Sequence, residues 1–314
     1  MRPTLLHSQR GVAVITALLL TTLAITIVAS LFWQQQVQVR SIENQRLQLQ
    51  NEWILRGALD WAGLILREDA KHSSIDNLDE PWAVSLAETR LDQYVENGRA
   101  DTDVADATLS GSVSDAQARY NLTNLCPDGT TIPAEVAVFA RLLDNAKLNP
   151  ALAQATADAM AASMKKPEAA AANSVGQPGP QPMNLTRVDD LFAVPGFSPA
   201  MIDKLKNFVI FLPRSTPVNV NTAPAEVLAA RIETLSLSAA AALVAERNTA
   251  SFRDLADFFN RLHARPYDAA NNLSVMTNYF LVNGKVRMNR AGLEVQALIE
   301  RSGTNTRLIW IREL

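Results

Sequence analysis

The strongest pattern in the chain is a long apolar run near its start. The run extends from Val12 to Trp33, with the sequence VAVITALLLTTLAITIVASLFW, and no charged residue lies between Arg10 and Arg40. About 22 apolar residues are enough for a helix to cross the hydrocarbon core of a bilayer. We therefore predict a transmembrane helix over residues 12–33.

The helix is expected to continue on the aqueous side, from Gln34 to about Ala70. Apolar residues recur there at three- and four-residue spacing, which is typical of one buried helix face: Leu47, Ile54, Ala58, Trp61 and Ile65. Charged residues occupy the other faces. The pattern predicts one long helix that is apolar first and amphipathic later, with Trp53 and Trp61 in the core.

The middle of the chain is predicted to be mainly helical. Leu86–Tyr94 is interpreted as a short helix, and Thr108–Leu125 as a hairpin with its turn at Ser114 and Asp115. The stretch Lys165–Asn184 is rich in Ala, Pro and Gly, which predicts a loop or a disordered linker. The remaining helical segments are Ala134–Lys147, Ala151–Met164, a helix-turn-helix in Thr186–Leu212, and three helices in Asn219–Leu262, with Thr222 as N-cap and Pro224 in the first turn.

The end of the chain changes to the two-residue period of strands. Tyr279–Val282 precedes Asn283-Gly284, a favoured hairpin turn pair. Two further strands, GLEVQALIER and TRLIWIREL, are separated by Ser302–Asn305. We expect an α+β fold in which the long first helix packs on an antiparallel sheet, with a large all-helical insertion.

Three interpretations of the start of the chain compete. The leader contains Arg2, His7 and Arg10, so the positive-inside rule places the N-terminus in the cytoplasm and the rest across the membrane. A cleaved signal peptide needs a shorter apolar core followed by a small-x-small site, which this segment lacks. A plain signal anchor gives no reason for Gly11 before the run. The third interpretation is cleavage after Gly11.

This leader resembles that of type IV pilins and type II secretion pseudopilins. The resemblance implies that a prepilin peptidase cuts after Gly11 and methylates the new N-terminus, Val12. Most such subunits carry Glu at the fifth mature position, where this chain has Thr16. A carboxylate inside a bilayer is costly unless it has a partner. Thr16 can instead bond to a helix carbonyl, which suits a subunit at the end of a filament.

Composition excludes several classes of function. The net charge is -3, which gives no electrostatic attraction to nucleic acid or anionic membranes. Cys126 is the only cysteine, so it forms no intrachain disulfide and is expected to be buried. The histidines show no ligand spacing, and no nucleophile motif, P-loop or GxGxxG is present, so we expect neither an enzyme nor a bound cofactor.

One segment resembles the helix-hairpin-helix module of DNA-binding proteins. Val218–Phe258 carries the ends of that module, but its hairpin, Glu233–Ser238, lacks the glycines that admit a phosphate. The basic residues Arg231, Arg247 and Arg253 are outnumbered by five acids: Glu226, Glu233, Glu246, Asp254 and Asp257. We therefore expect protein packing here and no nucleic-acid binding.

A calcium site is also considered. Asp101, Asp103 and Asp106 have loop-like spacing, but the segment has no turn glycine and no terminal Glu, so a solvated acidic loop is favoured and no metal ligand is assigned.

Over most of its length the chain resembles the minor pseudopilin K family of type II secretion. The resemblance rests on the leader, Thr16, Asn121-Leu122-x-Asn124-Leu125, the Asn221–Pro224 block and the ending Leu308–Glu313. It implies five segments: leader 1–11, transmembrane helix 12–33, pilin-like core 34–126, helical insert 127–272 (helix-hairpin-helix or SAM-like), and C-terminal strands 273–314. The resemblance also implies calcium binding in some members, but the corresponding region, Thr156–Asn184, has lost nearly all of the acids involved, so no ligands are carried over.

The implied function is structural. Such a subunit is a single-pass inner-membrane protein with a periplasmic domain. It forms the tip of the pseudopilus with minor pseudopilins I and J, initiates assembly for export of folded proteins, and also meets pseudopilin H and the major pseudopilin G. Two alternatives stay open: a minor pilin of a type IV pilus, and a DNA-uptake protein that uses Val218–Phe258.

Overall fold

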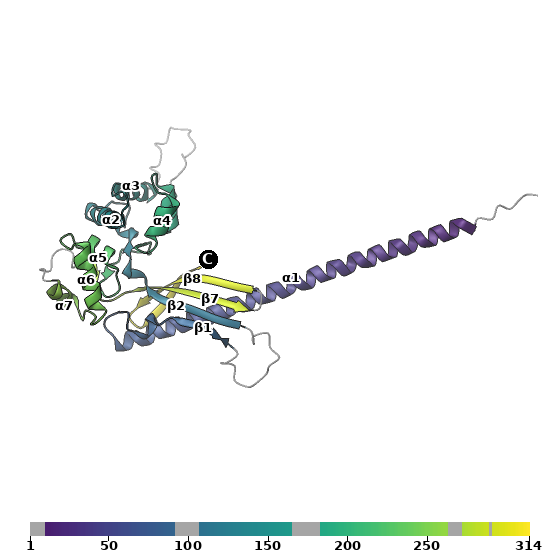
Figure 1. Cartoon of the computed structure of the whole chain (residues 1–314), viewed down its shortest axis with the longest axis horizontal. Coiled ribbons are helices and arrows are strands. Elements are labelled where there is room, and N and C mark those ends of the chain that lie inside the picture. The colour runs from purple at the N-terminus through teal and green to yellow at the C-terminus, as the bar shows by residue number, and fades with distance from the viewer. Residues whose placement is uncertain (1–9, 92–106, 165–182, 263–271, 289–290) are drawn as a thin grey trace, which may run out of the picture. The chain divides into compact units, whose positions relative to one another are not determined.

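A computed structural model describes residues 10–91, 107–164, 183–262, 272–288 and 291–314 of the chain (Figure 1). The α-helices are α1 Arg10–His72, α2 Pro133–Asn145, α3 Leu152–Met164, α4 Pro199–Leu205, α5 Ala225–Arg231, α6 Leu237–Arg247 and α7 Leu255–Arg261. The strands are β1 Leu86–Arg90, β2 Ala107–Asp115, β3 Tyr120–Asn121, β4 Val209–Ile210, β5 Val218–Asn219, β6 Leu273–Ser274, β7 Tyr279–Met288, β8 Ala291–Ser302 and β9 Asn305–Glu313. Short 3₁₀ helices are η1 Pro81–Ala83, η4 Ala116–Ala118, η5 Leu122–Leu125 and η6 Val188–Ala193.

Two compact units make up the chain. The first comprises Met1–Arg56, Arg90–Thr108 and Val286–Leu293, and the second comprises Gly57–Thr89, Leu109–Lys285 and Glu294–Leu314. Five strands form one sheet in the order β1-β2-β7-β8-β9, while β3 with β4 and β5 with β6 form small parallel pairs. The α+β prediction, with a long first helix, an antiparallel sheet and additional helices, is confirmed.

In the second unit, helix α1 packs on one face of the sheet. Leu59, Ala62 and Leu66 lie on one side of the helix and contact a cluster that includes Phe280 and Ile299. Trp82 completes this cluster, and its ring meets the Phe280 ring edge-on at a centroid distance of 5.2 Å. Side chains three and seven positions apart share a helix face, which explains why these residues are buried together.

The side of α1 that was predicted to be buried was wrong by one residue along the helix. Ile54, Ala58 and Ile65 are only partly buried beside the stripe that the sheet covers. Trp53 and Trp61, which were expected in the core, are 69% and 50% exposed. Apolar residues extend around more than one side of α1, so spacing alone did not identify the buried side.

The second face of the sheet packs against residues in and just after strand β4. Tyr279, Leu281 and Leu298 form a cluster there with Ile210 and Leu212. Successive residues of β7 therefore enter opposite cores, since side chains alternate along a strand. Burial on both faces explains why Tyr279–Val282 is apolar without alternation.

Two turn predictions were wrong. Asn283 and Gly284 lie inside β7, where Gly111 of β2 approaches them closely: a Cβ on Gly111 would be 2.7 Å from the Asn283 carbonyl oxygen. Ser114 and Asp115 likewise lie inside β2, and Asp115 ends that strand by accepting a hydrogen bond from the Gln117 amide. Asn283-Gly284 therefore marks a place where two strands lie close together, and Asp115 marks the cap of a 3₁₀ helix; neither pair forms a hairpin turn.

Three other secondary-structure predictions were wrong in whole or in part. Leu86–Arg90 is a strand and not part of a short helix, because pairing with β2 outweighs weak helix propensity. The hairpin expected over Thr108–Leu125 is absent: its second half forms η4, β3 and η5, and β3 pairs with β4 in parallel. The block after residue 186 forms η6 and α4 but ends in strand β4.

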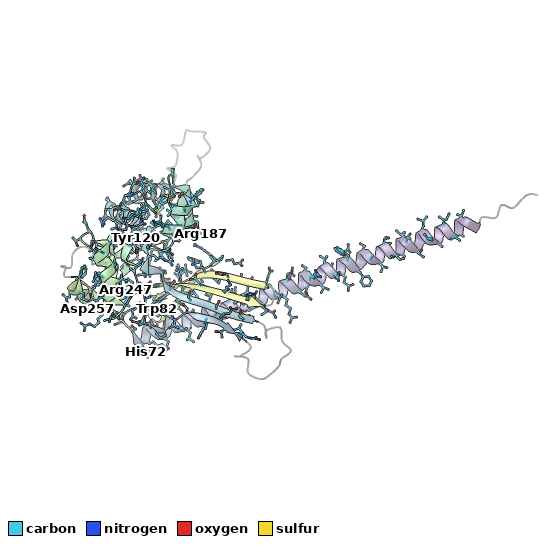
Figure 2. The ribbon with its side chains drawn as sticks, in the orientation of Figure 1. His72, Trp82, Tyr120, Arg187, Arg247 and Asp257 are labelled. Atoms are coloured by element: carbon cyan, nitrogen blue, oxygen red, sulfur yellow. The ribbon has the colours of Figure 1, made fainter. Side chains whose placement is uncertain are left out.

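The helical predictions for the insert are otherwise confirmed. Helices α2, α3, α5, α6 and α7 lie within about two residues of the expected segments or inside the expected block. They enclose one large core that contains Tyr120 (labelled in Figure 2). The rings of Tyr120 and Phe139 stack there at a centroid distance of 5.9 Å, and Cys126 is fully buried as expected. Helix α5 begins at Ala225 with Pro224 as N-cap, so the N-cap assignment of Thr222 was wrong.

Several expectations fall on residues outside the described part of the chain. These are the leader up to Gln9, the aspartates Asp101, Asp103 and Asp106, and most of the Lys165–Asn184 loop. The C-terminal strands are confirmed as β8 and β9, joined by a tight turn in which Gly303 has a φ of 56°. Such a left-handed conformation favours glycine, in agreement with the predicted turn.

We predict that Gly111→Ala lowers the free energy of unfolding by about 1–3 kcal/mol, because the new methyl group would overlap the Asn283 carbonyl. Gly57→Ala is the matched control, since nothing lies within 4 Å of a Cβ there, and helix propensity should stabilise it by about 0.5–1 kcal/mol. Urea denaturation of the full chain in detergent measures both. Equal effects in the two variants would contradict the close approach.

Candidate functional site

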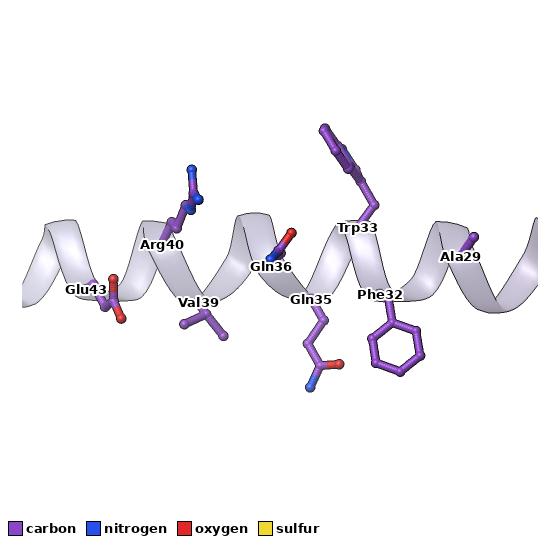
Figure 3. Close-up of a pocket in the computed structure, with 8 residues that line it drawn as sticks. All are labelled: Ala29, Phe32, Trp33, Gln35, Gln36, Val39, Arg40 and Glu43. Atoms are coloured by element: carbon purple, nitrogen blue, oxygen red, sulfur yellow. The ribbon is translucent and has the colours of Figure 1, made fainter.

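The first part of α1 is an uncovered apolar helix. All the side chains of Val12–Trp33 are exposed, and α1 is the one helix among the described residues that is long and apolar enough to cross a membrane. Figure 3 shows eight side chains between Ala29 and Glu43 that project from this single helix, where apolar Phe32 and Trp33 give way to Gln35, Gln36 and Arg40. The segment can therefore serve as a membrane anchor.

Polar side chains inside the apolar run bond to their own helix. The Thr16 hydroxyl donates to the carbonyl oxygens of Val12 (3.1 Å) and Ala13 (3.0 Å), which confirms the expected back-bonding. Thr21, Thr22 and Thr26 do the same with carbonyls three and four residues earlier. Their hydroxyl groups are satisfied without water, as a bilayer requires.

The predicted processing residues lie at the start of this helix. α1 begins at Arg10, so Gly11 and Val12 both fall in its first turn. Val12 is 60% exposed. Cleavage between them would leave the apolar helix on the mature chain, and this assignment stays a prediction.

Beyond the apolar run, α1 carries an exposed apolar stripe. Ile42, Leu49 and Trp53 are 65%, 56% and 69% exposed. Their spacing of seven and four residues places them on one side of the helix. The Arg56 guanidinium lies 5.8 Å from the Trp53 ring centroid, over its face. A stripe of large apolar side chains next to a membrane anchor is typical of a surface that packs against another helix.

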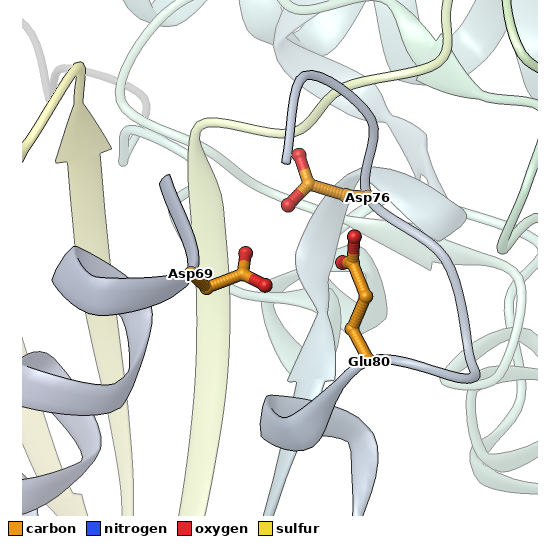
Figure 4. A group of neighbouring side chains, drawn as sticks. All are labelled: Asp69, Asp76 and Glu80. Atoms are coloured by element: carbon orange, nitrogen blue, oxygen red, sulfur yellow. The ribbon is translucent and has the colours of Figure 1, made fainter. Parts of the chain in front are cut away.

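Three carboxylates gather where α1 ends. Asp69, Asp76 and Glu80 have oxygen atoms within 4.8 Å of one another, and Figure 4 shows them converging from the last turn of α1, the following loop and the start of η1. This is the group of acidic residues, among those described, whose geometry could hold a cation.

Existing donors already occupy the oxygen atoms of this group. The Arg301 guanidinium pairs with Asp69 (2.8 Å) and, at shorter range, with Asp76. Glu80 accepts bonds from Trp82 Nε1 (2.7 Å) and Ser73 Oγ (2.7 Å). A cation would have to compete with a buried guanidinium for the same oxygens, so these residues fit an ion-pair network better than a metal site.

Burial governs the protonation of these aspartates. It raises the pKa of Asp76 to about 6, and the charge of Arg301 and the Thr277 amide oppose that rise. Burial also raises the pKa of Asp69, with Glu80 adding to the effect. The Arg301 guanidinium also lies over the Phe280 ring, 4.7 Å from its centroid, which adds a cation–π interaction to its ion pairs.

A neighbouring buried carboxylate joins the sheet to the insert. Asp115 accepts bonds from Thr222 Oγ1 (2.6 Å), Asn219 Nδ2 (2.8 Å) and the Gln117 amide (2.7 Å). Asn219 also donates to the Asp76 carbonyl at 3.0 Å. Burial raises the pKa of Asp115, and these donors lower it. The network links the end of β2 with β5 and with the loop that follows α1.

The asparagines of the NLTNL segment have a structural role. Asn121 donates to the carbonyl of Arg214 (2.7 Å), and Asn124 both donates to and accepts from the Thr216 backbone. Asn221 makes the same pair of bonds with the Phe252 backbone. Each side-chain amide thus acts as a substitute strand partner for a neighbouring segment.

The arginines of the helix-hairpin-helix-like module point inward. Arg247 donates to the carbonyls of Val220 and Ala223, both at 2.7 Å, and burial lowers its pKa to about 10 (Figure 2). Arg231 pairs with buried Glu135 at 2.7 Å and lies over the Tyr120 ring. Two of the three basic residues therefore stabilise the fold and are not available to a phosphate.

Comparison with known proteins shows the family. Two models described as type II secretion system protein K match residues 118–214 and 218–276. The chain belongs to the type II secretion system protein K family. A protein K of Pseudomonas aeruginosa is 28% identical over 304 residues, covering 90% of this chain and 86% of that protein. A protein K of Klebsiella pneumoniae is 27% identical over 320 residues, with coverage of 95% and 94%.

A solved structure has the same fold. The chain aligns with one in the crystal structure of the GspK-GspI-GspJ complex from enterotoxigenic Escherichia coli, with a TM-score of 0.67 and 21% identity. The alignment covers 87% of this chain and 98% of the other. The proteins of the protein K family are components of a secretion system. A helix that is long and apolar enough to cross a membrane agrees with such a role.

Sequence reasoning missed the ion pair at Arg301. Val295, Ala297, Ile299 and Arg301 are all buried and alternate along β8. The two-residue period would have placed Arg301 on the buried face, where a charge requires a partner. That conflict was the signal that could have found it.

We predict that Arg301→Gln lowers the free energy of unfolding by about 3–5 kcal/mol at pH 7, because it leaves buried carboxylates unpaired. The folded-state pKa of Asp76, about 6, exceeds its unfolded value of 3.8, so the folded state binds this proton more tightly. Near pH 5 Asp76 is largely protonated even in the wild type, and the loss should fall to no more than about half.

Urea denaturation at both pH values measures this difference. Arg307→Gln is the matched control, since its side chain is 75% exposed and its pair with Glu300 should contribute at most about 1 kcal/mol. An Arg301→Gln loss that is equal at pH 5 and pH 7 would show that Asp76 does not titrate as described.

Proposed function

We propose that this chain is a minor pseudopilin at the tip of a periplasmic pseudopilus. In this role it assembles with minor pseudopilins I and J, meets pseudopilin H and the major pseudopilin G, and initiates the filament that exports folded proteins. The observation that carries the proposal is α1, a single helix of 63 residues. The side chains of its first, apolar part are all exposed, and its later part carries the exposed apolar stripe Ile42, Leu49 and Trp53. Membership of the protein K family supports it.

The anchor sets the location. A basic leader before an apolar helix favours a cytoplasmic N-terminus, an inner-membrane span and a periplasmic folded part. A prepilin peptidase would act on the cytoplasmic side, after Gly11, and leave Val12 as the methylated first residue. The helix then stays with the mature protein and is available for assembly.

Two features support the proposed position at the tip. Thr16 bonds to its own helix and offers no carboxylate to the amine of a subunit above. The insert between β2 and β7 adds helices α2 to α7 to the sheet. Its bulk would leave no room for another subunit on that side. No nucleic acid is needed for this role, in keeping with the inward arginines of the insert.

We predict that the mature protein starts at N-methylated Val12. Mass spectrometry of the N-terminal peptide from membrane-extracted protein measures this directly. Gly11→Leu is expected to leave the leader attached, because the peptidase would no longer find the glycine at its cut. An intact Met1 in the wild type, or a cut after Ser30, would contradict pseudopilin processing.

We predict that Trp53→Ala weakens binding to the I–J pair at least about tenfold, since buried aromatic side chains dominate helix interfaces. Stability should not change, because Trp53 is 69% exposed. Gln48→Ala, an exposed position on another side of α1, is the matched control. Co-purification from detergent with titrated I–J pair measures both. Equal binding by the two variants would place the contact elsewhere.

A further inference from the structure

Glu80 is a buried carboxyl group that no cation neutralises directly. It lies just before η1 and is 8% exposed. Its oxygen atoms contact neutral groups, which are the Trp82 indole, the Asn77 amide and the Ser73 hydroxyl. The nearby cation, Arg301, pairs with two aspartates instead. A buried carboxylate without a cation is strongly disfavoured, and such groups tend to bind a proton.

The charges near Glu80 disfavour its ionisation further. Oxygen atoms of Asp69 and Asp76 lie within 4.8 Å of its own, as Figure 4 shows. The other titratable groups of this region are His72 on α1, Asp115 at the end of β2, Arg119 near Asp115, and Arg301 on β8. In this part of the described structure, four carboxyl groups thus meet two guanidinium groups and one exposed imidazole. A bound proton relieves this excess of negative charge.

The Ser73 hydroxyl indicates where the proton lies. Its oxygen is 2.6 Å from the Ile75 carbonyl oxygen and 2.7 Å from Glu80 Oε1. A hydroxyl group has one proton, and a carbonyl has none to give. With Glu80 ionised, Ser73 donates to it, and the oxygens of Ser73 and Ile75 are left close together with no proton between them. With a proton on Oε1, Glu80 donates to Ser73 and Ser73 donates to Ile75, so both short contacts are hydrogen bonds.

We propose that Glu80 is a protonated carboxylic acid at neutral pH, and that its proton locks the loop Ser73–Glu80, which ties the end of α1 to the insert. The acid donates from Oε1 to Ser73. Its Oε2 accepts from Trp82 Nε1 (2.7 Å) and from the Asn77 amide (3.2 Å). One proton therefore fixes both ends of the loop and the indole that follows it.

The locked loop holds the insert through Asp76. The Asp76 amide donates to the Val275 carbonyl (2.8 Å), and its own carbonyl accepts from Asn219 of β5 (3.0 Å). Its carboxylate accepts from the Thr277 amide at 2.7 Å. Loss of the Glu80 proton adds a second buried negative charge beside this carboxylate. The attachment of the loop to the insert therefore weakens as the pH rises.

Infrared spectroscopy of the full chain in detergent detects the proton directly. At pH 7, with a chelator present so that no metal ion replaces the proton, the wild type should show the carbonyl band of a protonated carboxyl group. The band should shift when the glutamate carboxyl groups carry ¹³C, and it should stay when only the aspartate carboxyl groups do. No band, or a band that shifts with labelled aspartate alone, would overturn the proposal.

A substitution assigns the band to one residue. Glu80→Gln should remove it, and the variant should fold, because its amide can donate to Ser73 while its carbonyl accepts from Trp82. Asp79→Asn is the matched control, since Asp79 is exposed in the same loop, and it should keep the band. A band that persists in Glu80→Gln would overturn the assignment. If this variant does not fold, labelling of the wild type still decides.

Urea denaturation tests the lock itself. Unfolded Glu80 is ionised above about pH 5, whereas the folded chain keeps its proton, so the folded state binds one more proton and loses stability as the pH rises. The unfolding equilibrium constant of the wild type, divided by that of Glu80→Gln, should therefore increase about tenfold per pH unit between about pH 5.5 and pH 7. The same ratio for Asp79→Asn should stay constant. A constant ratio for Glu80→Gln would overturn the proposal.

Discussion

The buried pair between Arg301 and two aspartates is the interaction on which the second unit depends. It joins the last turn of α1, the loop after it and β8, three segments far apart in the chain. Removing a charge from water costs several kcal/mol, so the pair persists because the guanidinium is surrounded by carboxylates, carbonyls and the Phe280 ring. Asp115 extends the same network into the insert through Asn219 and Thr222. A polar network of this kind specifies one arrangement of its elements more strictly than apolar packing does.

Residue patterns predicted the parts of the fold that depend on local chemistry. The apolar run identified the anchor helix, the three- and four-residue periods identified most helices, and Ser302–Asn305 identified the last turn. Those signals act over a few residues and need no distant partner. The resemblance to minor pseudopilin K came from the same kind of local block, such as Asn221–Pro224.

The errors arose where a distant segment decides the outcome. Asn283-Gly284 has the composition of a turn, but it lies inside β7, where Gly111 of the distant strand β2 approaches the Asn283 carbonyl, and no local signal reveals this contact. Ser114-Asp115 has turn chemistry, yet the carboxylate serves Asn219 and Thr222, about a hundred residues later. Trp53 was assigned to a core because aromatic side chains are usually buried, whereas its exposure fits a surface that a partner covers. The buried side of α1 and the Arg301 pair both required the sheet order.

The junction between β2 and β7 has an evolutionary consequence. These strands are neighbours in the sheet, although the whole helical insert lies between them in the chain. The insert leaves and returns at one place, where the Gln117 side chain accepts a hydrogen bond from the Asn278 amide at 2.7 Å. A segment whose two ends meet can be lengthened, shortened or exchanged at little cost to the sheet beneath it. The insert can therefore change in length or sequence from one lineage to the next without disturbing the pairing of β2 with β7.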